Sequence, residues 1–587
     1  MKKIISLLSA FVFVFCMLQV TAYADETVYK QINLPAEQFS YDSASSVIQK
    51  ALNEARDNAT DYLPYQINIP AGAYYLDTTL FVYSNTKLHL DDGATLLQTA
   101  PKGQNIIKAG FKEVNSGYGG YRNITVDGGT FNMNFNGSCA MRFGHCSNVN
   151  ITNVNVCNVK NAHHIEAAGV DSMNVTNCMF TSTVRSEGTT NSCEAIQLDI
   201  LHDSTHFPGY ENFDDTPNKN ITISGCTFTD LYSGIGTRSG VSGSYFDNIN
   251  IVNNKFNNIK EKAISCFNYK NSNISSNTFI DVNYGISFEY LPNDISSGNK
   301  RMYKPNSGIS NALDPNCSTT ISNNTLNITE KNGSLKSYAI YVYGAILDSA
   351  TAKKRGVTGG DYRIQNMTIS NNEINCLSSE ARGISVTGVN KSNITGNYLY
   401  DSAFASNGIN AVNVCSSEKN NISANVIDGT FNNGISLYDN GFAYSKNTDI
   451  SSNVINSVLS YGIRIATNSF ATIRNDNNIK KTGKSPICIK SKDYNQNIGT
   501  VTVRSTEFSQ KGKPVVRFLS VNGNSGYKVY RSTDNGSLTQ IATVPASSLN
   551  FEDKSARVNA KNYYRIFAYK TVEQSVIVGN DYVDASF

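Results

Sequence analysis

A short phrase recurs through most of the chain and limits the possible fold more than any other feature. It has β-branched residues that alternate with polar neighbours and are followed by a turn, as in NITISGCTF at 220 and MTISNNEI at 367. Further copies begin at 123, 148, 173, 248, 272, 319, 392, 420, 448 and 471. Alternation with a period of two predicts strands. Most copies are 23–28 residues apart, and a repeat of this length without helices predicts a stacked β-solenoid.

A second phrase lies between the copies of the first and carries an Ile at its third position. It begins with HHIEAAG at 163 and ends with SPICIKS at 485. Leucine-rich repeats are excluded because their Leu pattern is missing, and a propeller needs about 40 residues per blade. Read in register, the Ile residues predict one buried column in a parallel sheet. Its members are Ile165, Ile196, Ile235, Ile264, Ile286, Ile340, Ile384, Ile409, Ile435 and Ile463.

One turn position of the first phrase is occupied by Asn in successive copies from Asn254 to Asn453. Asn tolerates the left-handed backbone conformation that such turns require. Its side chain can also form hydrogen bonds with the Asn of the coil above and the coil below. The pattern therefore predicts an Asn ladder along the solenoid.

These repeats resemble those of the pectin-lyase-like superfamily of right-handed parallel β-helices. The segment SASSVIQKALNEAR (43–56) predicts an amphipathic helix, and the resemblance implies that this helix caps the N-terminal end. INIPAGAYYLDTTL at 67 and KLHLDDGATLL at 87 look like the first coils of that superfamily. The resemblance implies an all-β fold, a right-handed parallel β-helix over residues 25–497. It does not define a reaction, because many chemistries share this scaffold.

Both ends of the chain depart from the repeat. Residues 1–24 have a basic start, an apolar run and a small-x-small site before Asp25, which predicts a secretory signal peptide.

GYKVYRS at 526 and YYRIFAY at 563 are short strands between turns and predict a small β-sandwich over 498–587. It resembles a fibronectin-type-III-like domain in which Tyr replaces the usual Trp. We expect this domain to be separable from the solenoid.

Charge and hydropathy exclude some partners. Lys and Arg number 50 and Asp and Glu 47, so the net charge of +3 gives no reason to expect nucleic acid or an anionic membrane surface. After the signal peptide no apolar run approaches the ~20 residues that span a bilayer. We expect an exported monomer, secreted or at the cell surface.

The cysteines after Cys16 are too dispersed for a disulfide scaffold and are interpreted as small buried side chains.

Residues one and three positions after each Ile should point outward. Charge concentrates at these positions in the coils from 166 to 289. Long insertions follow the Ile strands at 200–219, 290–316 and 344–363, and we expect them to wall a groove beside these positions. The segment 201–217 is the richest in His, Asp and aromatic residues. The predicted substrate-binding residues are His163, His164, Gln197, His202, His206, Asp214, Asp215, Phe267, Glu289, Tyr341 and Tyr343.

Paired carboxylates give the most specific hypothesis. Glu166 and Asp199 are one coil and two positions apart, which places their backbones roughly 8 Å apart. An inverting glycosidase separates its two carboxyl groups by roughly 6.5–9.5 Å. Arg238, one coil beyond Asp199, is predicted to hold Asp199 ionised and to bind a sugar carboxylate. A structural ion pair is the alternative for these two residues.

Glu194 is a third catalytic candidate, which faces the groove only if the strand begins after it. Cys193-Glu194-Ala195-Ile196 resembles a phrase of the polygalacturonases of this superfamily. However, Asn191-Ser192, Ser233-Gly234 and Ala162-His163-His164 stand where that family has its catalytic motifs. The resemblance therefore does not imply polygalacturonase activity.

Three functions stay open. The favoured one is glycoside hydrolysis of a polysaccharide or oligosaccharide by Asp199, Glu166, Glu194 and Arg238, without a cofactor. A uronate lyase would need a base and a group that neutralises the carboxylate, so calcium at Asp199, Asp203, Asp214 and Asp215 is possible. The third is a non-catalytic glycan-binding surface protein. Phe267, Tyr341 and Tyr343 suit stacking on sugar rings but are equally compatible with an ordinary surface.

Overall fold

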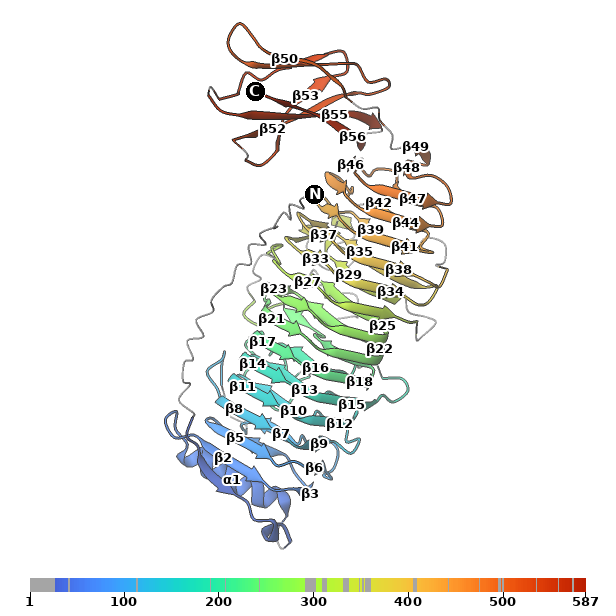
Figure 1. The fold of residues 1–587 in the computed structure, drawn as a ribbon. Coiled ribbons are helices and arrows are strands. Elements are labelled where there is room, and N and C mark those ends of the chain that lie inside the picture. Colours follow the sequence, from blue (N-terminus) through green and yellow to red (C-terminus); the bar gives the residue numbers. More distant parts are fainter. Residues whose placement is uncertain are drawn as a thin grey trace, which may run out of the picture.

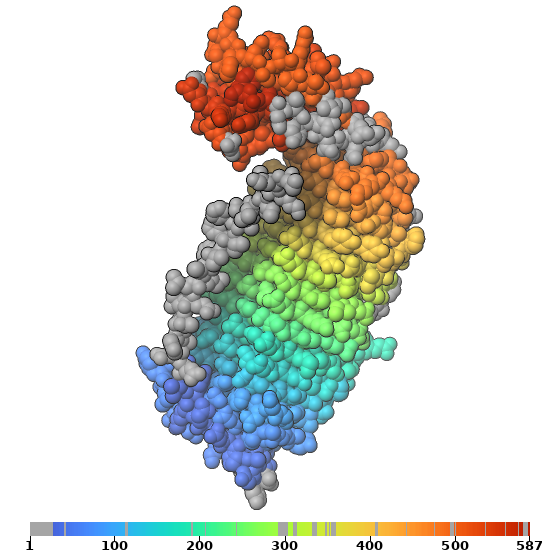
Figure 2. All heavy atoms as spheres, viewed as in Figure 1, coloured from blue at the N-terminus to red at the C-terminus, as the bar shows by residue number. Residues whose placement is uncertain are grey.

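Parallel strands stacked coil upon coil form a right-handed β-helix, with a small antiparallel domain at one end (Figure 1). The space-filling view shows the same long axis, with the C-terminal domain in orange and red (Figure 2). The protein is represented by a computed structural model, which describes residues 27–587 except 41–42, 112–114, 190–191, 206, 242, 291–301, 309–313, 331–336, 348, 351–352, 354–359, 405–408, 442, 475, 495–497, 499–500, 535, 558 and 573–574. The predicted signal peptide lies outside the described residues.

Three series of parallel strands make up the solenoid. One runs from β1 (Lys30–Asn33) to β46 (Ala471–Arg474), and a second from β3 (Gly72–Leu76) to β47 (Asn478–Thr482). The third, called the Ile face here, carries the second phrase. Its strands are β4 (Leu80–Val82), β7 (Ile107–Ala109), β10 (Met141–Gly144), β13 (Ile165–Ala168), β16 (Glu194–Asp199), β19 (Ser233–Gly236), β22 (Lys255–Phe267), β25 (Thr278–Glu289), β29 (Ser337–Tyr343), β35 (Ala381–Thr387), β39 (Asn410–Cys415), β42 (Asn433–Tyr438), β45 (Tyr461–Ile465) and β48 (Ile487–Ile489).

The predicted Ile column is confirmed at every position but one. Residues from Ile165 to Ile384 pair in register and are buried. In the next coil Val412 pairs with Ile384 and with Ile435. The prediction that Ile409 belongs to the column is therefore wrong, because this residue is buried but precedes β39. The phrase NGINAVN offers two apolar residues three positions apart, and the strand uses the later one. The outward residues of this coil are consequently Asn413 and Cys415.

The Asn ladder is present and longer than predicted. From Asn254 onward, the side-chain oxygen of each ladder Asn accepts hydrogen bonds from the coil before it, and its amide nitrogen donates to the next ladder Asn. The series ends at Asn477. From Asn254 to Asn453 the left-handed backbone belongs instead to the residue before the ladder Asn, as at Asn371 (φ 54°) and Ser452 (φ 55°). The ladder members are Asn254, Asn277, Asn324, Asn372, Asn397, Asn425, Asn453 and Asn477, all of them buried.

The predicted N-terminal cap is α1 (Ala44–Asn58). Ser43 caps its first turn by accepting a hydrogen bond from the Ser46 amide. Ile48 and Leu52 are buried and belong to the core of the solenoid. The helix packs against β2 (Tyr65–Ile69), β3, β4 and β5 (Thr86–Leu90) and thus covers apolar side chains that the first coil would otherwise expose. No helix in the described part of the chain is long and apolar enough to cross a membrane.

The C-terminal domain is a sandwich of two antiparallel sheets. One contains β50 (Val503–Phe508), β51 (Pro514–Phe518) and β54 (Asn550–Glu552). The other contains β52 (Gly526–Thr533), β53 (Thr539–Pro545), β55 (Asn562–Val572) and β56 (Ser575–Ser586). Tyr527 and Tyr564 are fully buried between the sheets, in agreement with the expected use of Tyr in this core.

This domain also closes the end of the solenoid. The beginning of β56 pairs in parallel with β46, joining Ile473 to Ile577. Val572 and Ile577 belong to the hydrophobic core of the solenoid. Arg474 of β46 donates a hydrogen bond of 3.2 Å to the hydroxyl of Tyr530 on β52. The two units therefore share a core at their junction, which the repeat pattern did not predict, and the expected separability has to be reconsidered.

Replacing Asn372 by Ala should destabilise the solenoid. Asn324 would lose the oxygen that accepts from its backbone and side-chain nitrogens, and the Ile321 carbonyl would lose its donor. Each buried group left unpaired costs roughly 1–3 kcal/mol. We expect the free energy of unfolding in a urea titration to fall by about 2 kcal/mol or more. Asn393→Ala, at an exposed position of β37 (Asn393–Thr395), is the matched control. Equal midpoints for both variants would contradict a stabilising role of the ladder.

Candidate functional site

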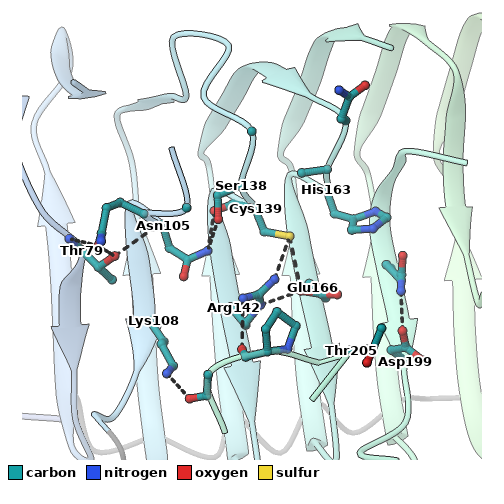
Figure 3. Close-up of a pocket in the computed structure, with 18 of the residues that line it drawn as sticks. Thr79, Asn105, Lys108, Ser138, Cys139, Arg142, His163, Glu166, Asp199 and Thr205 are labelled. Atoms are coloured by element: carbon teal, nitrogen blue, oxygen red, sulfur yellow. Dashed lines mark hydrogen bonds and ion pairs between the residues drawn. The ribbon is translucent and has the colours of Figure 1, made fainter. Parts of the chain in front are cut away.

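A groove crosses the Ile face from the coil of β4 to the coil of β19 and has a volume of about 530 Å³. Successive coils lie about 4.8 Å apart, so the groove is on the order of 20 Å long. Figure 3 shows Lys108, Arg142 and Glu166 on neighbouring strands along its floor. The register places these three side chains in one outward column, which continues to Gln197.

Glu166 is held by Arg142 rather than open to a ligand. Arg142 Nε lies 2.6 Å from Glu166 Oε2, and the Cys139 thiol donates to the same oxygen over 3.3 Å. The Arg142 Nη1 group donates to the Pro208 carbonyl over 3.1 Å. Burial raises the pKa of the Cys139 thiol to about 12, so this group stays a thiol. Glu166 is 3% exposed, and its partners are those of an ion pair that fixes the groove floor.

Asp199 lies at the end of β16 with no exposed surface. Gln197 Nε2 donates to Oδ2, while the Ile200 amide donates to Oδ1 over 2.9 Å. Ser239 Oγ is 3.4 Å from Oδ1. Burial, reinforced by the nearby charge of Glu166, raises the pKa of the Asp199 carboxyl from 3.8 to about 7. Near neutral pH this carboxyl is thus partly protonated.

The predicted ion pair between Asp199 and Arg238 is wrong. Arg238 is exposed, and within the described part of the chain it makes no ion pair with Asp199. The register joins Gln197 to Gly236, but β19 ends there, so the pairing does not continue to Arg238. Arg238 still lines the groove. It is therefore a cation at the groove rim and does not hold Asp199 ionised.

Glu194 faces outward, although strict alternation would turn it inward. The strand begins at Glu194 itself, after Cys193 in a left-handed conformation (φ 52°). A Cβ atom at Gly236 would come within 2.6 Å of Glu194 Cγ, so the Glu194 side chain covers Gly236 of the next coil. The His163 Nδ1 atom donates to the Glu194 carbonyl over 2.9 Å and lies 3.6 Å from Oε2. Within the described residues, Oε2 of Glu194 has no hydrogen-bond partner.

Two predicted binding residues are not accessible. His164 is fully buried beside Phe180, and its Nε2 atom bonds to the Thr181 carbonyl over 3.0 Å. Burial lowers the pKa of His164 to about 4, so its ring is neutral. Phe267 is also fully buried and cannot stack on a ligand. His206 lies outside the described residues.

The segment 201–217 forms one wall of the groove, as predicted, with Thr205, Pro208 and Gly209. Lys108 Nζ bonds to the Gly209 carbonyl and thereby ties this wall to the floor. From the other expected wall, 290–316, part lies outside the described residues.

Hydrogen bonds of His202, Asp214 and Asp215 hold the segment 201–217 in place. His202 Nδ1 is 2.6 Å from Asp215 Oδ1, and the amide of Asn306 donates to the same carboxylate. Asp214 accepts from the Gly117 amide over 2.7 Å and from Thr216 Oγ1 over 2.6 Å. These residues shape the wall and do not line the groove.

Glu289, Tyr341 and Tyr343 lie farther along the Ile face and are not part of this groove. Glu289 Oε1 is 3.2 Å from Lys262 Nζ. The rings of Tyr341 and Tyr343 stack with centroids 6.3 Å apart. In the part of the chain that the structure describes, no group of three or more His, Cys, Asp or Glu side chains is arranged to hold a metal ion.

Sequence reasoning missed the N-terminal half of the groove. Lys108 and Arg142 continue the outward column, and Asn105 and Phe111 line its end. Phe111 is 50% exposed and meets Phe81 edge-on at 4.7 Å. The column could have been extended, because Met141 and Ile107 occupy the place of the buried Ile. The segments CAMRFG and NIIKAG were not recognised as copies of the second phrase.

The chain matches no protein-family model. A curated relative, the plasmin and fibronectin-binding protein A of Streptococcus pneumoniae (strain ATCC BAA-255 / R6), is 26% identical over 315 residues, which are 48% of this chain and 43% of the relative. The match thus covers less than half of that relative's length. None of the similarities found is high enough to place the chain in a family.

Two solved structures illustrate the structural similarity. PfbA, described as a surface adhesin of Streptococcus pneumoniae, is 18% identical with a TM-score of 0.44, over 82% of this chain and 96% of that one. A double mutant of the tailspike protein of E. coli bacteriophage HK620 is 12% identical with a TM-score of 0.49, over 93% of this chain and 89% of that one.

The pKa of Asp199 predicts a specific pH dependence of stability. Between pH 4 and about 7 the folded protein keeps a proton that the unfolded chain releases, so stability falls as the pH rises through this window. Asp199→Asn should remove this component and stabilise the protein relative to the wild type at pH 8, but not at pH 4. Melting temperatures across this range measure the effect, with Asp77→Asn on the surface as control. A wild-type pH profile in the Asp199 variant would show that the carboxyl is ionised when folded.

Proposed function

We propose that this protein is a non-catalytic glycan-binding protein, exported to the bacterial surface or the extracellular space. The observation that carries the proposal is that most residues lining the groove have polar side chains, while the carboxylates Glu166 and Asp199 are buried. Glu166 is 3% exposed and Asp199 is 0% exposed. A carboxyl group must reach the scissile bond to act as acid, base or nucleophile. In this conformation neither group can do so.

The remaining lining suits a saccharide. Amide and hydroxyl side chains such as Asn105, Gln104 and Thr205 line the groove and can form hydrogen bonds with sugar hydroxyls. Phe111 offers a half-exposed ring at one end, and an aromatic face packs well against the apolar face of a sugar ring. Arg238 adds an exposed cation at the other end. The ring, the neutral polar groups and the charge are spread along the length of the groove, an arrangement that suits an elongated ligand.

The location of the protein is part of the proposal. The segment 1–24 supports export, as does the relative whose name describes binding to plasmin and fibronectin. We further propose that the solenoid belongs to the pectin-lyase-like superfamily and that the C-terminal sandwich is fibronectin-type-III-like. Its three-plus-four arrangement of strands supports this assignment. The proposed binding requires no cofactor and no second copy of the chain.

Glycoside hydrolysis is the second candidate, because one specific observation favours it. Asp199 has a pKa of about 7 and is close enough to Glu166 for the charge of that residue to contribute to the shift. A glycosidase uses one protonated and one ionised carboxyl group in this way. For such chemistry the groove would have to open until Asp199 meets the substrate.

Binding should depend on the two ends of the groove. On an array of bacterial and host oligosaccharides, we expect the full secreted chain to retain a defined set of glycans. Phe111→Ala should weaken their binding by roughly three- to tenfold through loss of ring contact, and Arg238→Gln should weaken binding of acidic members of the set. Phe508→Ala, an exposed ring of the C-terminal domain, is the matched control. Wild-type binding by both groove variants would refute the site.

The same glycans separate binding from cleavage. We expect no reducing ends and no ultraviolet-absorbing product after prolonged incubation with the wild-type protein. Release of reducing ends that falls by about 10²–10⁴-fold in Asp199→Asn would instead establish the hydrolase. Release that is unchanged in this variant would point to a contaminating enzyme and leave Asp199 without a catalytic role.

A further inference from the structure

A second groove lies on the Ile face near the C-terminal end of the solenoid, also with a volume of about 530 Å³. Its floor is an outward column whose residues pair in register from coil to coil: Asn413, Ser436, Arg464 and Cys488. Tyr438, Tyr461 and Lys484 complete its walls. It is built like the first groove, but from the coils of β39, β42, β45 and β48.

The charges of this groove are unbalanced. Among the residues that the structure describes, its lining contains Arg464 and Lys484 but no Asp or Glu. Neither cation forms an ion pair with any other residue that the structure describes; Lys484 instead lies over the Tyr461 ring, 5.3 Å from its centroid. In the first groove, by contrast, the partly buried Arg142 is paired with Glu166. Two unpaired cations in a concave site attract an anion and strengthen its binding.

Hydrogen-bonding groups in this groove are also left unused. Asn410 donates to Asn413 Oδ1 over 2.7 Å and accepts from Asn433 Nδ2 over 2.6 Å, which fixes the three amides. No other described residue bonds to the Asn413 side-chain nitrogen. Ser436 is 1% exposed, and its hydroxyl has no hydrogen-bond partner within the described residues. An unpartnered polar group buried in a groove costs stability unless a ligand or water satisfies it.

Aromatic rings stand beside these polar groups. Tyr438 and Tyr461 line the groove. Farther along the same face the ring centroids of Tyr338 and Tyr341 are 5.1 Å apart, and the ring of Tyr343 stacks on that of Tyr341. The groove therefore suits an anion that also has ring faces and hydroxyl groups. A sugar acid has both, whereas a simple inorganic anion has neither.

We propose that this second groove binds an acidic saccharide, with a sugar carboxylate held between Arg464 and Lys484. The planar guanidinium of Arg464 can pair with both carboxylate oxygens, and the Lys484 ammonium supplies a point charge. Asn413 and Ser436 bind hydroxyl groups of the same or the next sugar, and Tyr438 and Tyr461 pack against its ring. This site is separate from the first groove and does not depend on the function proposed there.

The test compares uronate-containing and sialylated oligosaccharides with their methyl-esterified counterparts, which keep the sugar and lose the charge. The wild-type protein should bind at least one acidic member about tenfold or more tightly than its ester, and salt should weaken that binding. Arg464→Gln and Lys484→Gln should each reduce the preference about tenfold, as expected for loss of a charged hydrogen bond. Lys481→Gln, exposed on β47 of the same coil, is the matched control and should bind like the wild type.

The first groove provides the second control. The preferences are compared in the Arg238→Gln background, which removes the exposed cation of the first groove, so that the preference for acidic over esterified glycans reports the second groove alone. Equal binding of acid and ester in that background, or an acid preference there that survives both Arg464→Gln and Lys484→Gln, would overturn the proposal. So would a loss of preference in Lys481→Gln equal to that in Lys484→Gln, since this would indicate a general charge effect.

Discussion

Every functional feature of this protein depends on the fixed register between successive coils. Backbone pairing alone aligns parallel strands, but a slip of one residue would turn every core side chain outward. The ladder from Asn254 to Asn477 opposes such a slip, because each buried amide bonds to the coils on both sides. With the register fixed, residues at equivalent positions form straight columns. The two grooves are stretches of such columns on a single sheet face.

The same geometry gives the two grooves different electrostatic properties, because only the side chains differ. In the first, Arg142 faces Glu166 from the adjacent coil, and the pair satisfies itself. Asp199 is fully buried in that groove, and burial raises its pKa to about 7, so near neutral pH the cost of a buried charge is partly avoided by protonation. In the second, Arg464 follows Ser436 and precedes Cys488, so the stretch of the column from Asn413 to Cys488 contains no carboxylate. Its charge is left for a ligand, which is why the acid-free groove rather than the acidic one points to an anion.

Periodicity made most of the fold predictable and also explains what was missed. The Ile column and the ladder repeat in every coil, so one sequence shows them many times over. The prediction for Ile409 was wrong because this coil has two apolar residues that could fill one core position. Lys108 and Arg142 were not recognised as groove residues because Met141 and Ile107 do not match the second phrase. Contacts such as His202 with Asp215 occur once, between loop residues without a repeat. Sequence reasoning therefore found the scaffold and the position of the first groove, but not which side chains line it.

The closure of the last coil bears directly on the second groove. β46 follows β45 in the chain, and its free edge would be exposed if β56 did not pair with it. Arg474 of β46 bonds to both Asp449 and Tyr530, which links the last coils to the C-terminal sandwich. In the sequence, β46 lies between Arg464 and Lys484. The distance between these two side chains therefore depends on how well the last coil, which β56 closes, is ordered. The C-terminal domain thus does more than extend the chain: it closes the last coil, which carries Lys484 and lies against the coil of Arg464.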